Sequence, residues 1–94
     1  MAEKKQKAKS ILKILAMPGC KEIILELNSK GILNFGKLAS LMNYRAKATR
    51  VVKELRNSGL VNRKILDDGL RTTQYSLTEK GKVVAEVLIR LDGL

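Results

Sequence analysis

The chain has 94 residues, 45% of them hydrophobic but only 3% aromatic, so it has room for one domain with a mainly aliphatic core. Its 19 Lys and Arg residues exceed the 9 acidic residues, and the formal net charge of +10 predicts a partner rich in phosphate groups. Charged residues interrupt every apolar run before the roughly 20 residues that a membrane span needs, so we expect a soluble chain with no membrane partner.

Residues 1–9 are polar and rich in Lys, and we expect a mobile basic tail ahead of one domain over residues 10–94. Order is expected from Ser10, followed by a short helix with an apolar stripe. That stripe consists of Ile11, Leu12, Ile14 and Leu15. The stretch "KKQKAKSILKILAMPGC" is superficially like a lipoprotein signal, but Lys13 interrupts its short apolar part. A helix that ends before Pro18 is therefore the better interpretation.

Residues 20–42 predict two helices with a short strand between them. The apolar face of the first helix is formed by Cys20, Ile23, Ile24 and Leu27. Gly31 is suited to a left-handed helix end, and residues 32–34 are long enough only for a bridging strand. Asn34 is a good N-cap for the second helix. The inward residues of that helix are expected to be Phe35, Leu38 and either Leu41 or Met42.

The longest helix is predicted over residues 45–58 and ends before Gly59, which favours the left-handed conformation that follows many helices. Its apolar face comprises Ala48, Val51, Val52 and Leu55. Its opposite face comprises Ala46, Arg50, Lys53 and Asn57, flanked by Lys47 and Glu54. The exposed side of this helix is therefore basic.

Two β-rich runs, residues 60–66 and 70–77, flank Asp67, Asp68 and Gly69 and predict a hairpin. The two acids stand within a basic region because Asp and Gly favour turn geometry. Since carboxylates repel phosphates, we expect the tip to point past a nucleic-acid backbone while cations on the strands approach it.

A last helix is predicted after the hairpin, with two competing start signals. Ser76 with Glu79 forms a capping box, and Thr78 is an alternative N-cap. The apolar stripe of this helix comprises Val84, Val87, Leu88 and Leu91. The first and the last helix thus both carry apolar stripes, which exceed the apolar surface that the elements between them require for a core.

This order of elements favours an α+β, mainly helical fold, a winged helix-turn-helix with flanking N- and C-terminal helices, because a two-stranded hairpin must pack on helices. The motifs "LRNSGLVNRK" and "YSLTEKG" occur in that order. Residues 20–90 resemble the winged helix-turn-helix transcription regulators of the MarR, PadR and HxlR type. The resemblance implies a dimeric, sequence-specific binder of double-stranded DNA, with a recognition helix in the major groove and a basic wing on the backbone.

The same resemblance assigns DNA-contacting residues. In the recognition helix they would be Arg45, Ala46, Lys47, Thr49, Arg50 and Lys53, and in the wing Arg63, Lys64, Arg71 and Thr72. The residues alone indicate the same region, because eight basic and three acidic residues lie between positions 44 and 71. Arg50 and Lys47 are the first candidates for base edges, since Arg and Lys reach guanine. The small Ala46 and Thr49 permit close approach or contact with a thymine methyl group.

Other function classes lack the residues they need. The chain has no His and no recognisable acid/base pair, so we expect no enzyme, and one Cys without His provides neither a metal site nor a reason to expect a cofactor. Cys20 is a candidate redox switch by resemblance, since some HxlR-type relatives use a cysteine near the amino-terminal helix. A Cys on an apolar face is more often a small buried hydrophobe. A single Cys fits a reducing cytoplasm, where a DNA-binding protein is expected to be nucleoid-associated.

Two alternatives to a sequence-specific regulator remain open. Abundant Lys would also suit an architectural chromatin protein with low sequence specificity. Some winged helices are protein-interaction adaptors, although the basic outer face predicted here is unlike the apolar or acidic face that such a role favours. A homodimer formed through the N- and/or C-terminal helices is expected, because the core is small and both terminal helices carry apolar stripes.

Overall fold

The computed structural model describes residues 10–42, 45–67, 69 and 72–94, so the expected tail over residues 1–9 lies outside the described residues. Within those ranges the helices are α2 (Ile11–Leu15), α3 (Cys20–Lys30), α4 (Phe35–Met42), α5 (Arg45–Asn57) and α6 (Glu79–Asp92). The strands are β1 (Ile32–Asn34), β2 (Val61–Ile65) and β3 (Thr73–Leu77). The α+β, mainly helical class and the predicted order of elements are confirmed.

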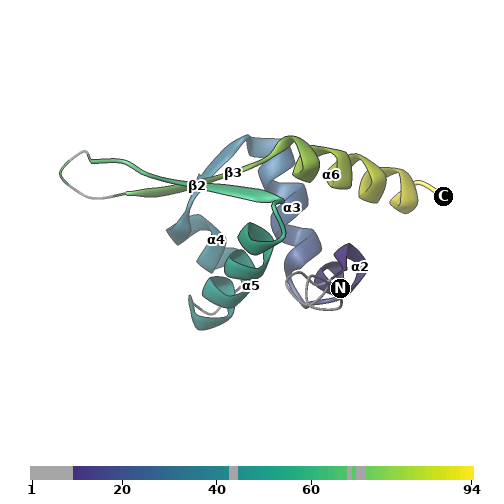
Figure 1. Ribbon diagram of the computed structural model, residues 1–94, viewed down its shortest axis with the longest axis horizontal. Helices are drawn as coiled ribbons and strands as arrows, with labels where there is room; N and C mark the ends of the chain where they lie inside the picture. Colours follow the sequence, from purple (N-terminus) through teal and green to yellow (C-terminus); the bar gives the residue numbers. More distant parts are fainter. Residues whose placement is uncertain (1–9, 43–44, 68, 70–71) are drawn as a thin grey trace, which may run out of the picture.

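The three strands form one antiparallel sheet in the order β1-β3-β2. Tyr75 on the central strand β3 lies opposite Leu33 of β1 on one side and opposite Arg63 of β2 on the other. Strands β2 and β3 form an arm that projects from the helical body (Figure 1), and this pair of strands with its connection is called the wing below. The predicted bridging strand β1 therefore attaches the wing to the helices.

Helix α3 lies in the middle of the molecule, with α4 and α5 on one side and α6 on the other (Figure 1). The apolar face predicted for it is buried, and so is the apolar face predicted for α5. Of the two candidates for the last inward residue of α4, Met42 is the one that is buried. Its side chain is 7% exposed, whereas Leu41 is 42% exposed. Aliphatic side chains from all three helices thus form the core.

Only part of each terminal stripe is buried. Ile14 of α2 and Leu88 of α6 belong to the core. In contrast, Leu12 is 79% exposed, and Val87 and Leu91 are 46% and 58% exposed. These helices lie at the edge of the core, so the chain covers one side of each and leaves apolar residues on the other.

The described wing strands are slightly shorter than the predicted runs. Strand β2 spans residues 61–65 of the predicted run over 60–66, and β3 begins at Thr73 and spans residues 73–77 of the predicted run over 70–77. Residues 70 and 71 of that second run lie outside the described residues. A hydrogen bond from the backbone N–H of Leu66 to the carbonyl of Thr72 (2.8 Å) closes the base of the connection between the strands. Gly69 has a φ of +89°, which agrees with its predicted role as the residue of positive φ.

The start of α6 is held by Thr78, which settles the competition between the two capping signals. The hydroxyl oxygen of Thr78 accepts a hydrogen bond from the N–H of Gly81 (3.0 Å), while Ser76 is part of β3. The same hydroxyl donates to the carbonyl of Gly59 (2.6 Å), just after α5. Thr78 therefore joins the end of the wing to the end of α5.

Gly81 is the point at which α6 approaches this junction most closely. A Cβ atom there would overlap the carbonyl oxygen of Leu60, which is backbone and has little room to move. We expect Gly81→Ala to lower the free energy of unfolding by about 1–3 kcal/mol, because overpacking outweighs the better helix propensity of Ala. Urea unfolding measures this loss.

Gly93→Ala is the matched control for this substitution. Gly93 also belongs to α6, at its C-cap, with a φ of −83°, and an added Cβ would meet other atoms only at ordinary distances of 3.6 Å or more. We expect a change within about 0.5 kcal/mol for this variant. Equal stability of both variants would show that α6 does not pack on the Leu60 carbonyl.

Candidate nucleic-acid interface

The side of α5 opposite the core is exposed to solvent. It carries Ala46, Arg50, Lys53 and Asn57, which are all exposed and are called the outward face below. Their spacing of four, three and four residues places them in one line along the helix. Within the described ranges, neither Arg50 nor Lys53 pairs with a carboxylate. The outward face therefore presents two uncompensated cations, an amide and one small residue.

The other predicted residues of α5 lie on its flanks. Lys47 is half-buried, whereas Arg50 is exposed, so Arg50 has the freer approach to a ligand. Thr49 lies on the opposite flank, and its hydroxyl donates a hydrogen bond to the carbonyl of Arg45 (2.9 Å). That bond uses the hydroxyl proton of Thr49, so its methyl group and its oxygen remain available for contacts.

The wing places its predicted cations on different sides. Residues directly opposite each other in a sheet point to the same side, and side chains alternate along each strand. Arg63 lies opposite Tyr75, which is buried against the helices, and Lys64 lies opposite Gln74. Arg63 therefore belongs to the helix-facing side of the wing and Lys64 to the outer side. Thr72 lies at the base of the connection, and Arg71 lies outside the described residues.

Two aromatic residues that the sequence reasoning did not assign to the site connect the wing with α5, namely Phe35 of α4 and Tyr75 of the wing strand β3. The guanidinium carbon Cζ of Arg45 lies 5.1 Å from the centroid of the Phe35 ring, within the range of a cation–π contact. The Phe35 and Tyr75 ring centroids are 6.4 Å apart, with the ring planes tilted by 54°. Since Phe35 and Arg45 are ten residues apart, no helical spacing could indicate this contact.

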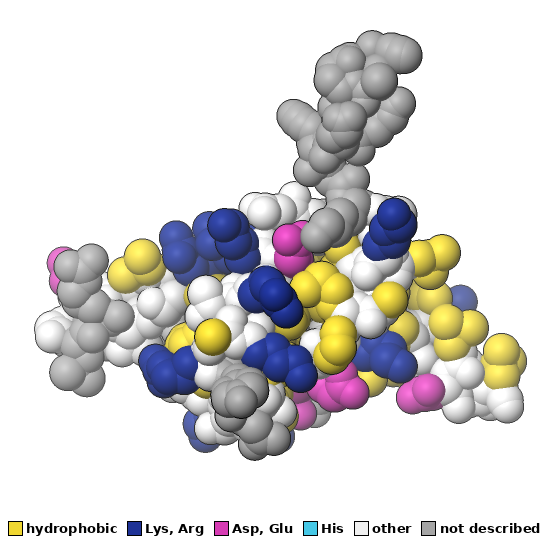
Figure 2. Space-filling model, turned by 90° about the horizontal axis from the view of Figure 1, so that it is seen from below, with side chains coloured by type: hydrophobic (Ala, Val, Ile, Leu, Met, Phe, Trp, Pro, Cys, Tyr) yellow, Lys and Arg dark blue, Asp and Glu magenta, His cyan; other side chains and the backbone are white. Residues whose placement is uncertain are grey.

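Positive side chains are spread over the α5 side of the molecule. Figure 2 shows Lys and Arg side chains around the base of the wing and over the region of α4 and α5. In the same view, hydrophobic side chains gather at the end formed by α6. The Lys and Arg side chains of this face suit a phosphate-rich partner.

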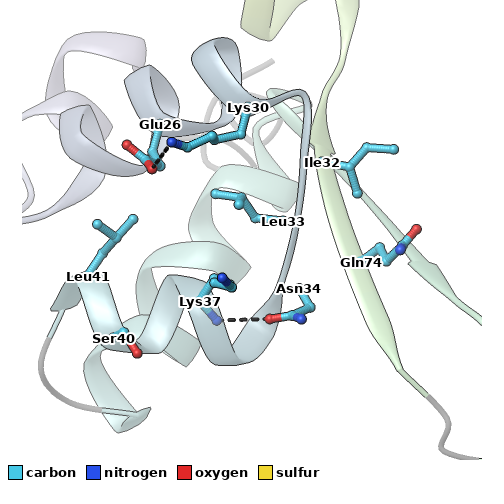
Figure 3. Close-up of a pocket in the computed structure, with 9 residues that line it drawn as sticks. All are labelled: Glu26, Lys30, Ile32, Leu33, Asn34, Lys37, Ser40, Leu41 and Gln74. Carbon is cyan, nitrogen blue, oxygen red and sulfur yellow. Dashed lines mark hydrogen bonds and ion pairs between the residues drawn. The ribbon is translucent and has the colours of Figure 1, made fainter.

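A groove beside this surface is lined by residues of α3, β1, α4 and β3 (Figure 3). Its carboxylate, Glu26, forms an ion pair with Lys30 (3.6 Å), and Asn34 accepts a hydrogen bond from the backbone N–H of Lys37 (2.9 Å). The Asn34 contact confirms the predicted N-cap of α4. Lys37 adds a further cation that the sequence reasoning did not single out. Among the described residues that line the groove, Glu26 has no second carboxylate as an acid/base partner.

Cys20 is completely buried in the core at the start of α3. Burial, together with smaller contributions from the carboxylates of Glu22 and Glu54, raises the pKa of its thiol from 9.0 to about 11. Since the thiolate is the reactive form, Cys20 sits in an environment that suppresses its chemistry. The geometry thus favours the role of a small core residue.

Among the described residues, no three His, Cys, Asp or Glu side chains gather in a group that could hold a metal ion. In the same part of the chain, no helix has the length and apolar character to cross a membrane.

Comparisons with known proteins also indicate a helix-turn-helix protein. The family model described as HxlR-like helix-turn-helix matches residues 20–94. A relative from Methanothermobacter thermautotrophicus, described as an uncharacterized HTH-type transcriptional regulator, is 45% identical over 40 residues, which are 43% of this chain and 30% of that protein.

Two solved structures share the fold. HlyU from Vibrio cholerae is 28% identical, with a TM-score of 0.73 over 97% of each chain. A mutant of ZitR from Lactococcus lactis is 24% identical, with a TM-score of 0.70, and the match covers 80% of this chain but 57% of that one. The similarity to ZitR is a similarity of fold alone.

The buried thiol gives a prediction about reactivity. With a pKa of about 11 in place of 9.0, the thiolate fraction of Cys20 below pH 9 is lower by about 100-fold than in an unfolded chain. We expect iodoacetamide to alkylate the native protein at least about 100 times more slowly than the urea-unfolded protein at pH 8. The native rate should keep rising with pH up to about 11. Mass spectrometry follows the reaction. Equally fast labelling of the native and unfolded states would instead favour the hypothesis that Cys20 is a redox switch.

Proposed function

Because the chain belongs to the HxlR-like helix-turn-helix family, we propose that it is a transcription regulator that binds double-stranded DNA in a sequence-specific manner. The observation that carries this proposal is the outward face of α5, with Arg50 and Lys53 exposed and without ion-pair partners among the described residues. A helix fits the major groove, where Arg can donate two hydrogen bonds to one guanine. Ala46 leaves room for the helix to approach the bases.

The residues of α5 take different roles in this proposal. Arg50, in the middle of the outward face, reads a base edge, and Lys53, one turn further along, contacts a phosphate. Lys47, the other candidate for a base edge, is half-buried on one flank and contacts the DNA backbone instead, as Arg45 does at the start of the helix. Thr49 offers a methyl group to a thymine, because its hydroxyl proton is bonded to the helix backbone.

The wing contributes affinity and little sequence preference in this proposal. Arg63 belongs to the side of the sheet that faces the helices and approaches a phosphate, whereas Lys64 on the outer side contributes mainly to the long-range field. Thr72, at the base of the connection, adds a further backbone contact, and the resemblance adds Arg71, which lies outside the described residues. The acidic side chain of Asp67 points past the backbone in this proposal.

The test begins with selection of bound sequences from a pool of random DNA duplexes. Against the selected duplex, Arg50→Ala should cost about 1–3 kcal/mol, or roughly 5- to 150-fold in Kd, and should reduce the preference at one base position. Lys82→Ala is the control, because Lys82 is an exposed cation on α6 that lies 3.8 Å from Glu79. Its Kd should change little.

The wing is tested in the same assay through its salt dependence. Arg63→Ala should lower the slope of log K against log salt by about 0.9 for all sequences, as expected for one lost phosphate contact. Lys64→Ala, which removes the same charge from the other side of the strand, should change the slope less. Sequence-blind losses from both Arg50→Ala and Arg63→Ala would instead indicate an architectural chromatin protein.

We also infer that the protein acts as a homodimer in the cytoplasm. Support comes from exposed apolar residues on the terminal helices, which face away from the core. They are Leu12 on α2 and Val83, Val87 and Leu91 on α6. Two copies related by a two-fold axis would place two recognition helices about 34 Å apart, one turn of DNA.

A charge on this side of α6 should separate the subunits. Val87→Glu is expected to convert a dimer to a monomer in sedimentation velocity at micromolar concentration, because a carboxylate would be desolvated in the interface. Ile89→Glu is the matched control, since Ile89 is similarly exposed (51%, against 46% for Val87) but lies on the other side of the helix. A monomeric unmodified protein would contradict the dimer, and equal effects of both variants would contradict this interface.

A further inference from the structure

The contact between Phe35 and Arg45 lies where α4, α5 and the wing meet. We propose that Phe35 is a positioning residue for DNA binding, whose ring holds the guanidinium of Arg45 at the amino-terminal end of the recognition helix. This inference rests on the proposed function. Phe35 itself touches no DNA in this mechanism, and it acts through Arg45.

The ring is well supported for this role. Phe35 is half-buried at the first position of α4, and its ring packs on that of Tyr75, which is only 6% exposed. Tyr75 belongs to the central strand of the sheet and is held by pairs on both sides. The ring that contacts Arg45 is therefore fixed from behind by the core of the sheet.

The stacked guanidinium keeps its binding capacity. A guanidinium is planar and its N–H donors lie in that plane, so contact with a ring leaves the donors available. In the part of the chain that the structure describes, the Arg45 side chain has neither an ion pair nor a hydrogen-bonded acceptor. Arg45 is thus held near one place with its donors unused, which suits a phosphate oxygen.

Without the ring, the position of Arg45 would be unfavourable. Arg45 is the first residue of α5, and the positive end of the helix dipole lies there, so the cation would tend to turn away. A cation–π contact offsets part of this repulsion and reduces the side-chain entropy that binding would otherwise cost. The ring therefore prepares Arg45 for binding before DNA arrives.

The two rings also connect the recognition helix to the wing. Arg63 lies opposite Tyr75 in the sheet, Tyr75 packs on Phe35, and Phe35 contacts Arg45. A cation therefore stands at each end of an aromatic pair. The Tyr75 and Phe35 rings therefore link two proposed DNA-backbone contacts, that of Arg63 on the wing and that of Arg45 on α5.

The experiment measures Kd for the selected duplex over a range of salt concentrations. Phe35→Leu should weaken binding about two- to fivefold, the amount expected for one cation–π contact, with no change in the salt slope because Arg45 keeps its charge. Phe35→Tyr, which keeps a ring, should bind like the unmodified protein. Arg45→Ala should both weaken binding and lower the salt slope by about 0.9.

A double-mutant cycle separates positioning from a general structural role. If Phe35 acts through Arg45, Phe35→Leu should cause no further loss of affinity when it is combined with Arg45→Ala. Equal losses with and without the Arg45 guanidinium would overturn the inference, since the ring would then act on the fold as a whole. Unchanged affinity of Phe35→Leu would overturn it as well.

Phe35→Met keeps the test decisive if Phe35→Leu does not fold. That variant removes the ring but keeps a large, adaptable apolar side chain, and we expect a similar two- to fivefold loss at an unchanged salt slope. Full affinity of Phe35→Met would contradict positioning by the ring. An unmodified protein that selects no duplex would overturn the proposed function itself, whereas normal selection with insensitive variants overturns this inference alone.

Discussion

The arrangement of the molecule depends on one close approach of backbone groups, in which the start of α6 packs on the carbonyl of Leu60. That carbonyl follows the end of α5, precedes β2, and accepts a hydrogen bond from the N–H of Thr78 (3.0 Å). The Thr78 hydroxyl bonds both to the carbonyl of Gly59 and to the N–H of Gly81. Only Gly at position 81 leaves room for this approach. The end of α5 and both strands of the wing therefore meet at one fixed point.

This junction has a consequence for binding, because DNA presents its phosphates at fixed spacings. A protein that contacts the major groove and the backbone together needs both contacts held at a constant separation. The junction fixes the wing to the end of α5 that is distant from Arg45. The rings of Phe35 and Tyr75 support the opposite end of α5 against β3. Helix α5 is thus held at two places against the same sheet.

Periodicity allowed much of this fold to be predicted. The buried faces of α3 and α5 follow from apolar residues at helical spacing, and the N-cap role of Asn34 follows from its side chain. The cations of the site were also predictable as a group, because they lie in one basic segment. Their individual places were not. Arg63 and Lys64 are neighbours in sequence, yet strand alternation and the register with β3 place them on opposite sides of the wing.

The sequence by itself determined the order of the elements, the faces of the central helices and the basic character of α5, because these follow from local spacing and side-chain type. Only the tertiary structure decided that Thr78 and not Ser76 caps α6, since pairing in β3 takes up Ser76. It also decided that Leu12 and Val87 face solvent, and that Phe35 contacts Arg45. Each of these depends on how elements distant in sequence pack together, and local periodicity carries no information about such packing.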